Sequence, residues 1–155
     1  MADQIYICVT PFFPTPDSFR GPYIYDQVKA IRRTGKYNVM VFKPTTLNDK
    51  RDSYEYEGIT VHLFPSVQMP SFFFNGLSNG FNCSMFLKCI ARLELDISRI
   101  AVVHGHTSSF AAYGIALKRL NPRIRTLVQH HDRDPFTIRN GRLAKMKPNL
   151  YYRAK

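Results

Sequence analysis

The stretch "QIYICVTPFFPTPDSFRGPYIYDQVKAIRRTGKYNVMVF", residues 4–42, decides the fold. It opens with a short apolar run, residues 4–9, whose β-branched and aromatic side chains predict a β-strand that stops at the following Thr-Pro pair. An irregular loop with three prolines and one glycine comes next, and Pro22 then stands where proline suits the first turn of a helix. Apolar residues at helical spacing predict that helix over residues 22–34, and the run at residues 37–42 predicts a second strand.

Strands and helices continue to alternate along the rest of the chain. Further strands are predicted at residues 59–64, 100–104 and 125–130, and further helices at residues 83–98 and 108–120. A polar segment before residue 59 has room for a small excursion or hairpin. The strands are short continuous apolar runs instead of polar and apolar alternations, which indicates parallel strands covered on both faces. We therefore predict a doubly wound, Rossmann-like α/β fold with a mostly parallel sheet and helices on both faces.

The charge is the unusual feature of the composition. A chain of 155 residues is the size of one ordinary domain, and 22 Lys and Arg against 11 Asp and Glu give it a formal net charge of +11. A field of that sign attracts phosphates, whether they belong to nucleic acid, anionic lipid or a nucleotide. A solvated basic face is the alternative interpretation, and charge alone does not choose between them.

The cysteines and the N-terminus indicate the compartment. Cys8, Cys83 and Cys89 form no CxxC pair and are odd in number, which argues against a disulfide framework and against a thiolate zinc site. The first residues show no signal peptide, and no apolar stretch reaches the length needed to span a bilayer. We therefore expect a cytoplasmic protein.

Four of the five histidines lie in two short motifs, "HGH" at residues 104–106 and the "HH" of "HHDRD" at residues 130–134. Both motifs follow predicted strands, and open parallel sheets bind ligands outside the carboxyl ends of their strands, where the strand order reverses. If the first strand lies at that reversal with the strand at residues 100–104 beside it, both motifs share one crevice with the first loop, residues 10–21. We expect a binding edge there.

Two other interpretations of the histidines stay open. One histidine of "HGH" can cap its strand while the other helps to start the next helix, which is a structural role. A zinc or di-metal hydrolase is the second, with ligands from His104, His106, His130 or His131 and from Asp132 or Asp134. Neighbouring residues on a strand point to opposite faces, so the "HH" pair is poorly suited to hold one ion, and we expect no metal.

Motifs that would indicate a cofactor are missing from the sequence. The first loop has a single glycine and no GxGxxG, no GxxxxGK[ST] occurs, and "TSSFAAYG" does not supply the GxSxG of a nucleophile elbow. We therefore expect neither a dinucleotide nor any other cofactor.

In their order and spacing, three stretches resemble the N-terminal domain of family 4 glycosyltransferases, which are retaining nucleotide-sugar enzymes of the two-domain GT-B architecture. The three are "ICVTPFFPTPDSFRGPYIYDQVKAIRRTGKYNVMVFKP", "VVHGHTSSFAAYGIALKRL" and "TLVQHHDRD". The last stretch looks like the family segment that usually reads HGxD, with Asp132 in place of its glycine. Nearly the whole chain fits this resemblance.

The resemblance implies roles for individual residues. In the family the first-loop glycine lets backbone amides approach the sugar nucleotide or the acceptor, and Gly21 is the matching position. The histidine of HGxD hydrogen-bonds the donor sugar, and His131 matches it if Asp134 is the family's aspartate, whereas aligning His130 loses that aspartate. His131 is therefore the expected catalytic residue. The expected substrate-binding residues are Arg20, Gly21, His104, His106, Thr107, His130 and Asp134.

The resemblance also implies a domain organisation and partners. Residues 1–140 are expected to form the acceptor-side domain, and the basic segment at residues 141–155 to lead towards a donor-binding domain that the chain lacks, so that the chain alone is inactive. The expected partners are a nucleotide-sugar donor, a glycan or lipid-linked acceptor and the anionic inner face of a membrane, with no nucleic acid. A basic phosphate-binding or nucleic-acid-binding module and the metal-dependent hydrolase remain the alternatives.

Overall fold

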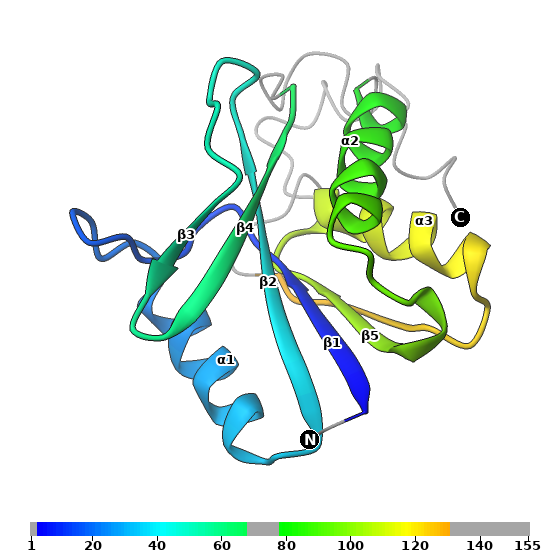
Figure 1. Ribbon diagram of the computed structural model, residues 1–155, viewed down its shortest axis with the longest axis horizontal. Coiled ribbons are helices and arrows are strands. Elements are labelled where there is room, and N and C mark those ends of the chain that lie inside the picture. Colours follow the sequence, from blue (N-terminus) through cyan, green and yellow to red (C-terminus); the bar gives the residue numbers. More distant parts are fainter. Residues whose placement is uncertain (1–2, 68–77, 131–155) are drawn as a thin grey trace, which may run out of the picture.

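A computed structural model describes residues 3–67 and 78–130 of the chain, and Figure 1 shows its arrangement. In chain order the elements are β1 (Gln4–Val9), α1 (Pro22–Arg33), β2 (Tyr37–Thr45), β3 (Ser53–Tyr56), β4 (Ile59–Pro65), α2 (Asn79–Arg92), the 3-10 turn η1 (Ile97–Arg99), β5 (Ile100–Gly105), the 3-10 turn η2 (Ser108–Phe110), α3 (Ala111–Leu120) and β6 (Arg125–Val128). The strands form one six-stranded sheet in the order β3-β4-β2-β1-β5-β6. This confirms the predicted α/β fold with a mostly parallel sheet.

Strand β1 lies at the point where the strand order reverses. It pairs in parallel with β2 on one side and with β5 on the other, so the chain runs outwards from β2 to the hairpin of β3 and β4 and then crosses back over the sheet to β5. At its carboxyl end Val9 stands opposite Phe42 of β2 and opposite Gly105 of β5. The condition that the sequence set for a shared crevice, with the strand at residues 100–104 beside the first strand, is therefore met.

The two faces of β1 bury different cores, as expected for a strand covered on both sides (Figure 1). Ile5, Ile7 and Val9 pack with residues of α2 and α3, while the alternate residues Tyr6 and Cys8 pack with residues of α1. The short apolar run that predicted this strand thus serves both cores at once.

The outer strand β3 is formed by the polar segment for which the sequence predicted room for an excursion or hairpin. It pairs antiparallel with β4, and the register places Tyr56 opposite Ile59 across a tight turn. All the other pairings between neighbouring strands of the sheet are parallel.

The predicted helix over residues 83–98 is wrong at both ends, because α2 runs from Asn79 to Arg92. Glu94 takes the left-handed conformation at φ 51°, which an α-helix does not continue through. Asp96 then accepts a hydrogen bond of 2.8 Å from the backbone N–H of Ser98 and begins η1. The predicted helix over residues 108–120 likewise begins with the 3-10 turn η2, and β6 ends two residues before the predicted strand.

All three cysteines are free thiols, with Cys8 and Cys89 buried and Cys83 half-buried. Burial raises the pKa of each thiol, so these groups stay protonated at neutral pH. They pack as small apolar side chains within the domain.

Candidate functional site

Backbone hydrogen bonds join the carboxyl ends of three strands into one edge. The N–H of His106 donates to the carbonyl of Val9 at 2.9 Å, and the N–H of Gln129 donates to the carbonyl of Gly105, also at 2.9 Å. The first loop (residues 10–21), residues 105–107 and residues 129–130 therefore leave the sheet side by side. We call these three segments the carboxyl edge. Up to residue 130 they include the crevice residues that the sequence predicted, except His104, which lies inside β5.

Gly21 shapes the first loop at this edge. Its φ of 79° lies in the left-handed region, and its carbonyl accepts the first hydrogen bonds of α1. A Cβ at this position would lie 2.7 Å from the backbone oxygen of Phe12, so the chain passes too close for any side chain. The positive φ and the close approach of Phe12 each require glycine at position 21, which is the position that the family resemblance matched to the first-loop glycine.

The start of the same loop is held by Thr10, whose side chain is fully buried. Its hydroxyl donates to the carbonyl of Phe12 at 2.8 Å, and the N–H of Phe12 returns a bond of 3.2 Å to that hydroxyl. This local turn fixes how the chain leaves β1. Arg20, at the far end of the loop, is exposed.

His104 is a buried partner of Tyr6 from the neighbouring strand. The Tyr6 hydroxyl lies 2.7 Å from Nδ1 of His104. Burial raises the pKa of the Tyr6 hydroxyl well above its ordinary value, so the hydroxyl keeps its proton and can donate it to Nδ1. In the tautomer that accepts this bond at Nδ1, the His104 proton is on Nε2. Neither the role of Tyr6 nor this pairing followed from the sequence.

The backbone of His106 belongs to the carboxyl edge, and its buried ring stacks on that of His104. The two ring centroids are 4.2 Å apart with an interplanar angle of 30°, and the residues are 1% and 5% exposed. Between them, Gly105 leaves room for the next segment, since a Cβ there would lie 3.0 Å from backbone atoms of Phe110. The "HGH" motif therefore places its two histidine rings on the same side of the chain. Its middle residue, Gly105, lets η2 pack closely against the backbone.

The remaining predicted site residues are less enclosed. The Thr107 hydroxyl lies 2.7 Å from that of Ser109 at the start of η2, and Thr107 itself is half-buried. His130 is exposed just after β6. His131, Asp134 and the basic segment at residues 141–155 lie outside the described residues. Within residues 3–67 and 78–130, no three His, Cys, Asp or Glu side chains come together as a group that could hold a metal ion.

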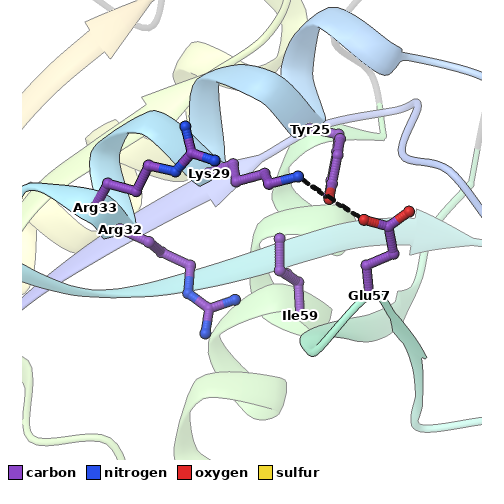
Figure 2. A pocket seen from close by; sticks show the side chains of 6 residues that line it. All are labelled: Tyr25, Lys29, Arg32, Arg33, Glu57 and Ile59. Carbon is purple, nitrogen blue, oxygen red and sulfur yellow. Dashed lines mark hydrogen bonds and ion pairs between the residues drawn. The ribbon is translucent and has the colours of Figure 1, made fainter.

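A surface hollow of about 370 Å³ lies between α1 and the turn that joins β3 to β4, as Figure 2 shows. It is lined by Tyr25, Lys29, Arg32, Arg33, Glu57 and Ile59. Lys29 donates to the Tyr25 hydroxyl at 2.9 Å and pairs with Glu57 at 3.9 Å, and the Tyr25 hydroxyl donates to Glu57. These contacts tie α1 to the turn between β3 and β4, which is a structural role at the end of the sheet where β4 begins.

We predict that the close approach at Gly21 makes it less replaceable than Gly35, a matched control. Both glycines have positive φ, at 79° and 66°, so alanine costs conformational free energy at either place. A Cβ at Gly35 would meet nothing within 4 Å, whereas one at Gly21 would meet Phe12. Urea denaturation should therefore show an extra loss of about 1–3 kcal/mol for Gly21→Ala. Equal losses for the two variants would contradict the close approach.

We also predict that Tyr6→Phe lets the ring proton of His104 shift between Nδ1 and Nε2. Without the hydroxyl donor, Nδ1 no longer accepts a fixed hydrogen bond, and the free energy of unfolding should fall by about 1–3 kcal/mol. The ¹⁵N chemical shifts of the imidazole nitrogens report the tautomer. Tyr37→Phe is the control, because it removes the hydroxyl of the ring that packs on Tyr6 at 5.7 Å between centroids and should leave the shifts of His104 unchanged. Identical His104 shifts in the native protein and in Tyr6→Phe would show that Tyr6 is not the donor.

The chain is similar to a known protein family and to a solved structure. No curated protein sequence matches it. The structure of sucrose-phosphate synthase from Thermosynechococcus elongatus is similar, with a TM-score of 0.50 and 13% sequence identity over 83% of this chain and 64% of that one. The match thus spans less than two-thirds of that protein and shows a shared fold. Glycosyltransferase Family 4 matches residues 21–155. The chain therefore belongs to Glycosyltransferase Family 4.

Proposed function

We propose that this chain is the acceptor-side domain of a retaining glycosyltransferase that moves a sugar from a nucleotide-sugar donor to a glycan or lipid-linked acceptor. The observation that carries the proposal is the carboxyl edge at the reversal of strand order, in a chain that belongs to Glycosyltransferase Family 4. This is the place where open parallel sheets hold their ligands. Family membership favours this function over a nucleic-acid-binding module or a metal-dependent hydrolase.

The carboxyl edge has a chemistry that suits sugars. Gly21 and Gly105 are buried and let Phe12 and Phe110 pack closely against the backbone, which shapes the edge that a ligand would meet. Thr107 and His130 add a hydroxyl and an imidazole, which hydrogen-bond hydroxyl groups without bringing a fixed negative charge. Such neutral donors and acceptors match the hydroxyls of a glycan.

The proposed roles follow from these positions. His131 hydrogen-bonds the donor sugar and is the catalytic residue, while Arg20, Gly21, Thr107, His130 and Asp134 contact substrate. His104 and His106 are buried, so in this proposal they support the carboxyl edge from below and fix the backbone that follows β5. No metal and no cofactor takes part.

Transfer also requires a donor-binding domain, because GT-B catalysis depends on two domains closing around the donor. In this proposal residues 1–140 form the acceptor-side domain, residues 141–155 lead towards the donor side, and residues 1–155 alone transfer no sugar. We further propose a cytoplasmic protein whose net charge of +11 brings it to an anionic membrane face. Among the described residues, no helix combines the length and apolar character needed to cross a membrane.

We predict that His131→Ala lowers sugar transfer by roughly 10- to 150-fold in the protein that carries this chain. The change removes one hydrogen bond to a charged or sugar-bearing donor, a loss of about 1.5–3 kcal/mol if the bond is made in the transition state. The assay follows radiolabelled sugar from a panel of nucleotide sugars into glycan and lipid fractions. The matched control removes two lysines of the basic segment, Lys145→Gln and Lys147→Gln, which should change only salt-sensitive association. Normal turnover by His131→Ala, or loss of chemistry in the lysine control, would contradict the proposed site.

A further inference from the structure

A half-buried lysine lies beside the first loop, on the β2 side of β1. Lys43 belongs to β2, and its ammonium lies 5.5 Å from the centre of the Tyr54 ring on β3. The Tyr54 hydroxyl donates to the carbonyl of Phe13 in the first loop at 3.3 Å. Lys43 therefore lies between the first loop and β3, one residue beyond the level at which β1 ends next to Phe42.

Two arginines lie close enough to Lys43 to interact with its charge. The pKa of Lys43 is lowered, first by burial and then by repulsion from Arg51 and from Arg20. Arg20 comes from the first loop directly before Gly21, and Arg51 comes from the segment between β2 and β3. We call Arg20, Lys43 and Arg51 the cation cluster. The Tyr54 ring under Lys43 reaches Phe13 of the first loop, and Gly21, the neighbour of Arg20, packs against Phe12 of the same loop. Three parts of the chain that are separate in sequence thus each bring a positive charge to the surroundings of Tyr54 and the first loop.

One carboxylate accompanies the cation cluster, and it is already engaged. Asp49 accepts two bonds from the Arg51 guanidinium, at 2.9 and 2.8 Å, one from the Arg51 backbone N–H at 3.1 Å and one from the Thr45 hydroxyl at 2.7 Å. These hydrogen bonds hold the pKa of Asp49 well below its usual range, so it stays ionised. Three cations and one carboxylate leave an excess of two positive charges at the cluster.

The negative charge of a phosphate group would balance this excess of positive charge. A phosphate monoester carries about −1.5 to −2 charges at neutral pH and offers three acceptor oxygens. Guanidinium groups present planar pairs of donors to phosphate, and a lysine adds a compact charge. Half-burial of Lys43 strengthens the attraction, because charges interact more strongly where water is excluded.

We propose that Arg20, Lys43 and Arg51 form a phosphate-binding subsite that holds a phosphate group of the acceptor next to the carboxyl edge. This inference rests on the proposed function, since that function makes this domain the acceptor side. The phosphate belongs either to a lipid headgroup that carries the acceptor or to a soluble phosphorylated glycan. Both sources present the same chemistry to the cation cluster.

The first test titrates the 155-residue chain with inorganic phosphate by calorimetry and by NMR of the lysine side chains. We predict that Lys43→Met weakens binding about 10- to 100-fold, the loss of one charge-assisted contact. Arg20→Gln, a change in an exposed loop residue, should weaken it similarly and guards against a variant that misfolds. In the native chain, bound phosphate should raise the pKa of Lys43, because a nearby anion favours the ammonium form.

The matched controls are Lys29→Met and Arg33→Gln, which remove the same charges from the hollow shown in Figure 2. A chain with a net charge of +11 attracts phosphate everywhere, so only a difference between the two sets locates a site. The controls should change binding by less than about twofold at physiological ionic strength, since neither Lys29 nor Arg33 is among the charges that shift the pKa of Lys43. Equal losses in both sets, or phosphate binding by Lys43→Met as tight as by the native chain, would overturn the subsite.

The second test separates the two sources of phosphate. One arm uses methyl phosphate in solution, and the other uses phosphatidylcholine vesicles that contain phosphatidic acid. Dependence on Lys43 in the soluble arm supports a phosphorylated glycan, and dependence in the vesicle arm alone supports a lipid headgroup. No dependence on Lys43 in either arm overturns the subsite.

Failure of the subsite and failure of the proposed function give different results. If the cation cluster binds phosphate but the protein consumes no nucleotide sugar, the subsite stands and the glycosyltransferase proposal fails. If sugar transfer proceeds and Lys43→Met transfers to the acceptor with an unchanged KM, the function stands and the subsite is overturned.

Discussion

The parallel pairing of β1 with both β2 and β5 is the constraint on which the rest of the structure depends. It aligns the last residue of the first strand, Val9, with Phe42 on one side and Gly105 on the other. Because strands in parallel register end together, the loops that follow β1 and β5 must leave the sheet at neighbouring points. The carboxyl edge follows from this register, and the bonds from His106 to Val9 and from Gln129 to Gly105 close it.

The glycines and histidines of the carboxyl edge serve the same geometry in different ways. Gly21 and Gly105 allow backbone segments to approach within distances that a side chain would block. His104 and His106 fill the space beneath the edge, where Tyr6 supplies a hydrogen-bonding partner for the first ring. The structural interpretation of "HGH" and its place at a binding edge are therefore compatible, since buried rings can hold the backbone that a substrate would contact.

Much of the fold could be predicted from the sequence, because the apolar runs of the strands and the helical spacing of residues 22–34 are local signals. The end of α2 could not, since it depends on the left-handed backbone of Glu94. The pairing of Tyr6 with His104 spans 98 residues, and no short-range pattern indicates it. The cation cluster could not be predicted either, because its three residues come from separate parts of the chain. His131 and Asp134, which the family resemblance identified, lie outside the described residues, so their roles stay predictions.

The most direct measurement is a crystal structure of the protein that carries this chain, grown with the acceptor that its transfer assay identifies. The acceptor should lie on the carboxyl edge, within hydrogen-bonding distance of backbone atoms in the first loop and in residues 105–107. An acceptor bound instead in the hollow between α1 and the β3–β4 turn, against Lys29 and Glu57, would contradict the placement of the site at the carboxyl edge.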